Sequence, residues 1–196
     1  IFVGLRYSYL NNKWRKRPYV YKQSIDVDYS ITQMALSTTY NGLFPTLFGK
    51  WDLITRGYYD GVRWINFYGL GNETTNITKD RDYYRMRTEE AAFTAGLGRI
   101  IGNSKFKFSA GYSRVKILQD TARYVYKSIT GTQPFLLQPD QFAGIEAEYE
   151  YTNVNDSILP SKGLTVALSA KHTQNLVTAN KSFQTASANV QFFVPI

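Results

Sequence analysis

The residues best able to do chemistry are acidic side chains that recur at every second position. Asp26 and Asp28 stand two residues apart, as do Glu146, Glu148 and Glu150. Carboxylates at this spacing could hold a divalent cation, or they could be solvated and paired with basic groups, and we favour the second interpretation. The basic residues placed to pair with them are Arg6, Arg56, Lys107 and Lys171.

Little else in the sequence supports catalysis. The chain has one histidine, His172, and a general base or metal ligand needs partners within reach, which no nearby spacing supplies. Gly69 and Gly71 lack the third glycine of a dinucleotide-binding loop. The absence of cysteine excludes disulfides and thiolate metal sites. We therefore predict no catalytic residue, no metal, no cofactor and no enzymatic activity for this chain.

Alternation of apolar and polar residues with a period of two predicts the elements that position the charges. Successive side chains of a strand point to opposite faces of a sheet, so each such segment has one apolar and one polar face. No segment of comparable length has helical spacing, and the sequence therefore predicts an all-β chain of about ten strands. The predicted strands cover residues 1–10, 19–32, 34–45, 50–59, 62–69, 82–100, 104–117, 140–154, 163–173 and 181–194.

The predicted connections alternate between long and short. In an up-and-down sheet alternate connections lie at opposite ends, so one rim is predicted to be short and the other elaborated. Short turns at one rim, longer loops at the other and strands of about ten residues are typical of outer-membrane barrels. The longer connections are 11–18, 44–50, 70–81, 118–139 and 174–181, and the tight turns lie near 33, 60–61, 102–104 and 160–163.

Composition excludes two broad classes. With 43% hydrophobic and 16% aromatic residues among 196, the chain can bury far more apolar surface than a disordered protein. A helical membrane protein is excluded because no window approaches the roughly 18 apolar residues of a spanning helix. The sequence thus favours an antiparallel transmembrane β-barrel, one partial domain over residues 1–196, whose polar face borders a watery lumen. The residues expected to line that lumen are Arg6, Asp26, Asp28, Arg56, Lys107, Glu146, Glu148 and Glu150.

The net charge of +8 is concentrated in the segments 13–17, 79–87 and 114–127, which we expect at the long-loop rim. Basic and aromatic surfaces can bind nucleic acid, but lipid headgroups and lipopolysaccharide phosphates at a membrane rim account for the charge equally well. We favour lipid and lipopolysaccharide as partners, with other outer-membrane or periplasmic proteins as further candidates and no nucleic acid.

Two segments resemble a known family. Residues 66–74 read Asn-Phe-Tyr-Gly-Leu-Gly-Asn-Glu-Thr and residues 82–87 read Asp-Tyr-Tyr-Arg-Met-Arg. They resemble the bacterial surface antigen family, the barrel shared by outer-membrane assembly factors and two-partner secretion transporters. The turn at 155–163, with its Pro-x-x-Gly ending, is similar to a turn of that family. The residues that carry the motif are Phe67, Gly69, Gly71, Asn72, Tyr84, Arg85 and Arg87.

The resemblance implies a bacterial outer-membrane barrel of sixteen strands that inserts or exports proteins or anchors another domain. The family's Arg-Gly-aromatic loop tip is absent here. The chain begins as the middle of a strand and ends as a strand finishes, so we expect it to be part of a longer protein. Residues 14–18 and 49–53 resemble, more narrowly, barrels attached to a calcineurin-like metallophosphoesterase domain. A membrane-anchored enzyme and a soluble barrel that binds carbohydrate or nucleic acid therefore remain as alternatives.

Overall fold

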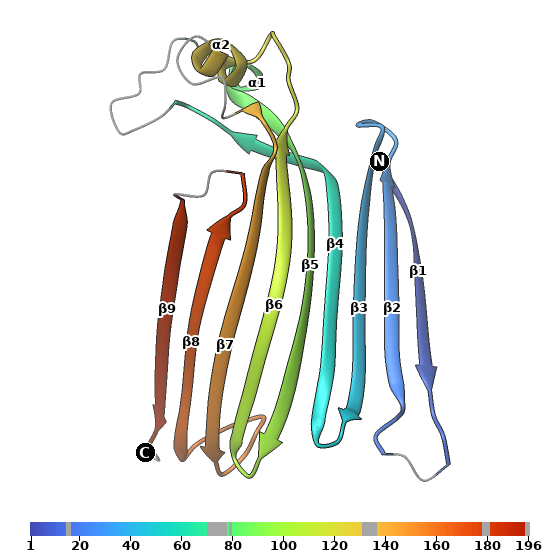
Figure 1. Cartoon of the computed structure of the whole chain (residues 1–196), viewed down its shortest axis with the longest axis vertical. Coiled ribbons are helices and arrows are strands. Elements are labelled where there is room, and N and C mark those ends of the chain that lie inside the picture. Colours follow the sequence, from blue (N-terminus) through green and yellow to red (C-terminus); the bar gives the residue numbers. More distant parts are fainter. Residues whose placement is uncertain (15–16, 70–77, 79, 131–136, 178–180, 195–196) are drawn as a thin grey trace.

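The computed structural model describes residues 1–14, 17–69, 78, 80–130, 137–177 and 181–194. In this part of the chain one sheet of nine antiparallel strands runs in sequence order from β1 to β9 (Figure 1). This confirms the predicted all-β, up-and-down architecture. Neither of the two short helices in the described part is long and apolar enough to cross a bilayer. The elements are β1 (Phe2–Asn11), β2 (Tyr21–Ser30), β3 (Ala35–Phe48), β4 (Trp51–Asn66), α1 (Arg81–Tyr84), β5 (Arg85–Ile101), β6 (Ser104–Ile117), α2 (Tyr124–Thr130), β7 (Asp140–Val154), β8 (Gly163–Asn175) and β9 (Ser182–Phe193).

The predicted turn at 60–61 is wrong, and the strands predicted on either side of it are the single strand β4. Asp60 pairs with Glu90 and Arg63 pairs with Thr88, so two residues of β4 lie opposite one residue of β5. This is a bulge, which bends a strand without reversing it. Beyond the bulge β4 turns aside across the top of the sheet (Figure 1).

Merging two strands moves the earlier connections to the opposite ends of the sheet. The long-loop rim carries the connections 31–34, 67–84, 118–139 and 176–181, and the short-turn rim carries 12–20, 49–50, 102–103 and 155–162. The first loop was expected among the elaborated connections, but it lies at the short-turn rim. Its basic segment therefore lies at the opposite end from 114–127, which corrects the expectation that all three basic segments share one rim.

Smaller boundary differences have local causes. β3 continues to Phe48, so the loop predicted at 44–50 shrinks to a turn in which Gly49 has a left-handed φ of 69°. Residues 82–84, predicted as the start of a strand, belong to α1. The Asp80 side chain caps this helix by accepting a hydrogen bond from the Asp82 backbone N–H at 2.9 Å.

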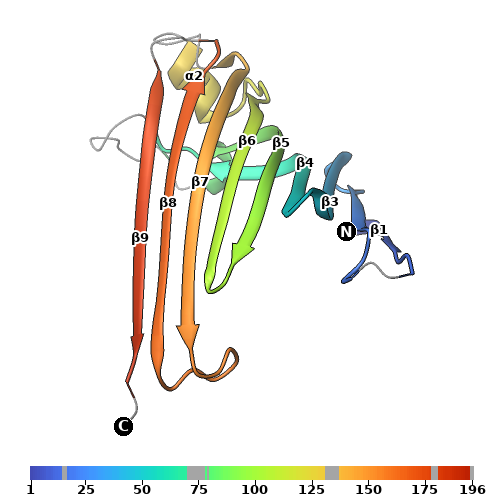
Figure 2. The same cartoon turned by 60° about the horizontal axis from the view of Figure 1, so that its bottom comes forward.

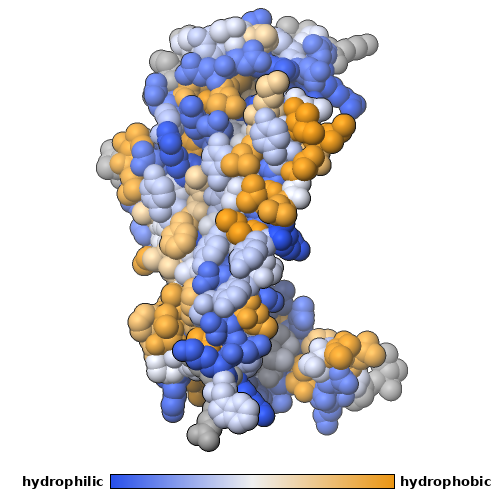
Figure 3. Space-filling model, turned by 90° about the vertical axis from the view of Figure 1, so that its right-hand side faces the viewer, coloured by the Kyte–Doolittle hydropathy of each residue, from blue (hydrophilic) through white to orange (hydrophobic). Residues whose placement is uncertain are grey.

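The register gives the sheet one apolar and one polar face. On the apolar face Leu97 of β5 lies opposite Phe108 of β6, which lies opposite Ala147 of β7. On the polar face Lys107 lies opposite Glu148. The strands β1–β4 lie at an angle to β5–β9, so the sheet curves like part of a barrel wall (Figure 2). Seen from the β1 side, hydrophobic patches alternate with hydrophilic ones along the strands, and hydrophilic residues predominate at the long-loop rim (Figure 3).

Candidate functional site: the two faces of the wall and its packed rim

The polar face carries every charged residue that the sequence predicted for the lumen. The register places all of them on this one face: Arg6, Asp26, Asp28, Arg56, Lys107, Glu146, Glu148 and Glu150. Strand alternation brings them together because each strand contributes every second residue to a face. That this face borders a watery lumen stays a prediction of the barrel architecture.

Several of these charges form cross-strand ion pairs. Arg6 pairs with Asp26 between β1 and β2. The Lys107 ammonium lies 2.7 Å from a carboxylate oxygen of Glu148, and the Lys105 ammonium lies 3.5 Å from Glu150. The two lysine pairs are partly exposed, so each contributes no more than about 1 kcal/mol to the free energy of unfolding. The pairs keep carboxylates and cations in balance along the polar face.

Glu146 and Arg56, which also lie on the polar face, have no ion-pair partner within the described part of the chain. Glu146 lies opposite Lys171 in the register without forming a salt bridge, and Arg56 lies between Asn41 and Thr94. In the described residues no three His, Cys, Asp or Glu side chains come close enough together to hold a metal ion. The arrangement is a mixed-charge wall.

Three polar-face residues that form ion pairs, Lys105, Arg63 and Glu90, were missed at the sequence level. Lys105 was not singled out, although it shares the alternation phase of Lys107. Arg63, which lies 2.5 Å from a Glu90 carboxylate oxygen, was assigned to a separate strand. The bulge shifts the alternation of β4 by one residue, and this shift places Arg63 on the same face as Glu90. No local sequence signal predicts the bulge.

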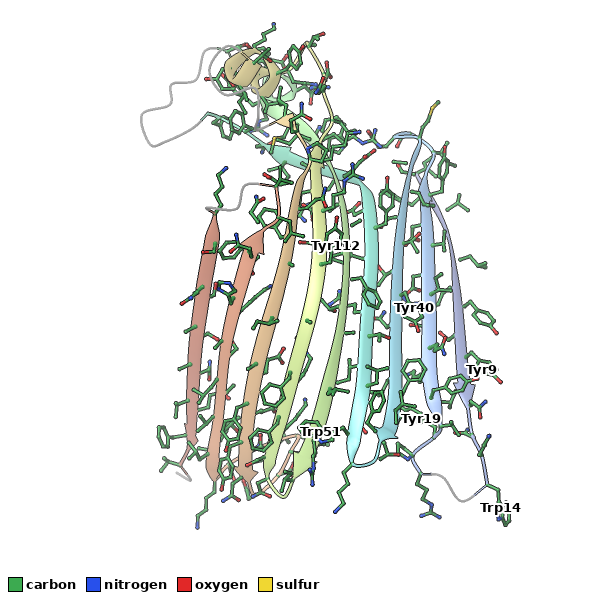
Figure 4. All side chains as sticks on the ribbon, in the orientation of Figure 1. Tyr9, Trp14, Tyr19, Tyr40, Trp51 and Tyr112 are labelled. Atoms are coloured by element: carbon green, nitrogen blue, oxygen red, sulfur yellow. The ribbon has the colours of Figure 1, made fainter. Side chains whose placement is uncertain are left out.

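The apolar face ends in a row of aromatic rings at the short-turn rim. Tyr9, Tyr21 and Phe44 follow one another across β1–β3 at centroid distances of 5.8 and 5.9 Å. Phe106 and Tyr149 continue the row across β6 and β7 at 5.1 Å. Tyr9 and Trp51 lie toward this rim, and Tyr112 lies toward the other (Figure 4). Rings at the edge of an apolar band are typical of the interfacial girdle of a membrane barrel.

The height of the apolar band fits the hydrocarbon layer of a membrane. On β5 the charged residues of the apolar face are Glu89 and residues before it at one end and Arg99 at the other. Ten residues of strand extend about 33 Å, which becomes about 25 Å along the membrane normal at a tilt of about 40°. Between those ends the apolar positions of the described strands carry one charged residue, Arg114, which lies opposite Ala91 near the long-loop end of the band.

His172 lies on the apolar face, where it stands opposite Ile145 and Gln184. The acidic residues of β7 point to the other face of the sheet. The structure therefore does not bring the single histidine together with the carboxylates that a metal site or an acid–base pair would need.

The long-loop rim carries the hydrophobic cluster of the described chain, a cap formed by α2 and the ends of neighbouring strands. Val125 and Ile129 of α2 and Leu137 are buried, and Met86 of β5 and Ile117 of β6 pack against them. Met86 and Ile117 both belong to the polar face of the sheet. The cap therefore covers the upper end of the polar face.

The family-motif residues fasten this cap. Tyr84 is 3% exposed and its ring lies 5.0 Å from that of Tyr68 and 5.3 Å from that of Tyr124. The guanidinium of Arg85 lies 5.1 Å from the centre of the Trp64 ring, and that of Arg123 lies 5.5 Å from the same ring. Cation–π contacts of this kind stabilise a partly exposed cluster.

Arg87 ties three elements of the rim together. Its Nε and Nη2 atoms donate to the carbonyl oxygen of Gly61 at 2.9 and 2.7 Å, and Nη1 donates to the carbonyl of Gln33 at 3.1 Å. The Gln33 side chain in turn accepts from the Trp64 indole N–H at 3.2 Å. Arg87 thus holds the β4 bulge against the turn between β2 and β3.

Of the remaining four motif residues, the structure describes two. Phe67 packs against the cap cluster and Gly69 has a φ of 125°, a value that favours glycine. Gly71 and Asn72 lie outside the described residues.

The turn between β7 and β8 is held by its own polar side chains. The Asn155 carbonyl oxygen of the side chain accepts from the backbone of Ser161 and Lys162 at 3.0 and 2.8 Å. A carboxylate oxygen of Asp156 accepts from the backbone N–H groups of Ile158 and Leu159, and these bonds lower the pKa of Asp156 below its ordinary value. At the other rim the Ala122 amide and then Arg123 lower the pKa of Asp120.

One comparison with known proteins identifies the family. The family model described as the Omp85 superfamily domain matches residues 7–196. No curated protein and no solved structure matches the chain. Membership of this superfamily points to the bacterial outer membrane. The matched residues include both faces of the sheet and the motif at the long-loop rim. Because the match covers nearly the whole chain, the chain belongs to the Omp85 superfamily.

Proposed function

We propose that this chain is the membrane-spanning wall of an outer-membrane barrel that inserts or exports other proteins. The observation that carries the proposal is the cap over the upper end of the polar face. A diffusion pore needs an open polar channel, whereas here α2 and Leu137 are packed against Met86 and Ile117 at the mouth. Membership of the Omp85 superfamily directs the proposal toward polypeptides rather than small solutes.

The two faces support a role that is physical rather than catalytic. The strands β2 to β8 are paired on both sides, and β1 and β9 are each paired on one side. Pairing satisfies the backbone hydrogen bonds that lipid cannot. The ion pairs of the polar face favour hydration of that face. The aromatic row favours the headgroup region and so sets the position of the sheet along the membrane normal. Such a wall can present a protein to the membrane without forming a covalent intermediate.

Reconstitution tests the proposal. The full-length protein is placed in phospholipid vesicles, a urea-denatured outer-membrane barrel is added as substrate, and folding is followed by its heat-modifiable mobility on gels. We expect faster folding than in vesicles that contain an unrelated barrel of similar size, or protease-protected substrate inside the vesicles if the activity is export. Equal folding and no protection in both preparations would refute insertion and export.

The anchor for a metallophosphoesterase domain stays the alternative. It predicts that the full-length protein hydrolyses phosphate esters in a metal-dependent manner while the folding of added barrels is unchanged. The same vesicles can be assayed for both activities, so the two proposals give opposite results.

A further inference from the structure

Arg99 is the cation of the apolar face at the short-turn rim. It lies opposite Phe106 in the register, and its guanidinium lies 5.7 Å from the centre of the Trp51 ring. The Trp51 ring lies 6.2 Å from that of Phe108, so the cation borders the aromatic row. Arg99 is half-buried among these rings, directly below the apolar band.

No carboxylate in the described part of the chain pairs with Arg99. The acidic residues of the neighbouring strands point away from it, since Asp52, Glu148 and Glu150 all lie on the polar face. Asp52 is also engaged by the backbone N–H of Thr46 at 2.7 Å. The apolar face thus presents a positive charge whose partner must come from outside the sheet.

The surroundings select the kind of partner. A molecule that binds Arg99 from the apolar face needs an apolar chain to pack against Leu97 and Phe108. It also needs an anionic group to contact the guanidinium. An arginine fork binds phosphate oxygens through paired N–H donors, and indole rings favour the headgroup region of a bilayer. Lys50, in the turn just before Trp51, adds a second exposed positive charge at this rim.

We propose that Arg99, Trp51 and Lys50 form a binding site for an anionic phospholipid at the short-turn rim. The phosphate accepts hydrogen bonds from the guanidinium while one acyl chain lies along the apolar face beside Leu97. The site fixes the height of the wall in the leaflet opposite the long-loop rim. It requires that the apolar face contacts lipid, but it does not depend on whether the barrel inserts, exports or anchors.

Quenching of Trp51 fluorescence tests the site. The full-length protein carries Trp14→Phe, Trp64→Phe and Phe in place of any tryptophan outside residues 1–196, so that Trp51 is the single tryptophan. It is reconstituted in phosphatidylcholine vesicles that contain an equal fraction of brominated phosphatidylglycerol or of brominated phosphatidylcholine. One basic residue at a membrane surface contributes about 1 kcal/mol toward an anionic lipid, which is about a fivefold preference. We expect brominated phosphatidylglycerol to occupy the position beside Trp51 about fivefold more readily.

Two variants complete the test. Arg99→Gln should bring the preference close to one, and Arg99→Lys should retain most of it. Arg56→Gln, which removes an unpaired cation from the polar face, should leave it unchanged, and heat-modifiable mobility checks that each variant is folded. Equal quenching by the two lipids in the parent protein, or an unchanged preference in Arg99→Gln, would overturn the site. Quenching by neither lipid would overturn both the site and the contact of this face with the membrane.

Discussion

Replacing Arg87 with alanine should loosen the long-loop rim without unfolding the sheet. The guanidinium donates to two carbonyl oxygens, at 2.9 and 2.7 Å to Gly61 and at 3.1 Å to Gln33. Hydrogen bonds from a charged group contribute about 1.5–3 kcal/mol each. Gly61 is buried and Gln33 is half-buried. Water that enters the space left by the side chain replaces the three bonds only in part, so we expect the free energy of local opening to fall by about 2 kcal/mol, less than the full sum.

Hydrogen exchange measured by mass spectrometry on the protein in detergent micelles follows this opening directly. A loss of about 2 kcal/mol corresponds to about thirtyfold faster exchange where opening is rapid and reversible. The acceleration should be confined to peptides that cover residues 31–36 and 60–66. Peptides from the centre of β7 should exchange as in the parent protein.

Arg63→Ala is the matched control. Its side chain forms one partly exposed ion pair with Glu90 next to the same bulge, which contributes no more than about 1 kcal/mol. Exchange should therefore rise by no more than about fivefold. If Arg87→Ala and Arg63→Ala accelerate exchange equally, or if Arg87→Ala has no effect, Arg87 does not fasten the rim.

Three further results are expected. Phe93→Arg puts a charge near the middle of the apolar band and should lower the free energy of unfolding in lipid vesicles by about 2–4 kcal/mol. Thr94→Arg, on the polar face, should lower it by less than about 1 kcal/mol. Equal losses for the two variants in urea titrations would contradict the assignment of the two faces. A double-mutant cycle with Lys107→Gln and Glu148→Gln should give a coupling energy below about 1 kcal/mol, and a larger value would mean that this pair is not solvated. The pKa of Asp156 is lowered from 3.8. The hydrogen bonds that its carboxylate accepts should therefore stabilise the β7–β8 turn at neutral pH and be lost as the pH falls through that lower folded-state pKa. Amide chemical shifts of the turn should follow this titration, and in Asp156→Ala the pH dependence of these shifts should disappear.

Strand alternation predicted the two faces because the period of two is a local property. Glu146, Glu148 and Glu150 must share a face in any strand that contains them, whatever lies beside it. Their partners depend on register, which local sequence does not encode. Lys107 meets Glu148 only in the register that β6 and β7 adopt across the long connection at 118–139.

The rim could not be predicted in the same way. An Asp-Gly pair such as Asp60-Gly61 is a strong hairpin signal, yet here Gly61 lies in a bulge held by Arg87, which is 26 residues away in sequence. Arg87 also reaches Gln33 over a separation of 54 residues. Contacts at such separations leave no local pattern.

The sequence carries a weak helical signal at α2, which was not predicted. Val125 and Ile129 stand four residues apart, the spacing of one helical face, and both are buried in the cap. The helix has only seven residues. So short a segment inside a long connection does not establish a helical period.

We expect the odd-numbered residues of β5 within the apolar band to face lipid and the even-numbered residues to face water. Nitroxide labels on single cysteines at positions 92 to 97, in the full-length protein in phospholipid vesicles, measure this by collision with oxygen and with a water-soluble nickel chelate. We predict high oxygen accessibility at 93, 95 and 97 and high nickel accessibility at 92, 94 and 96. A reversed phase, or no alternation along these six positions, would mean that the apolar face does not contact lipid.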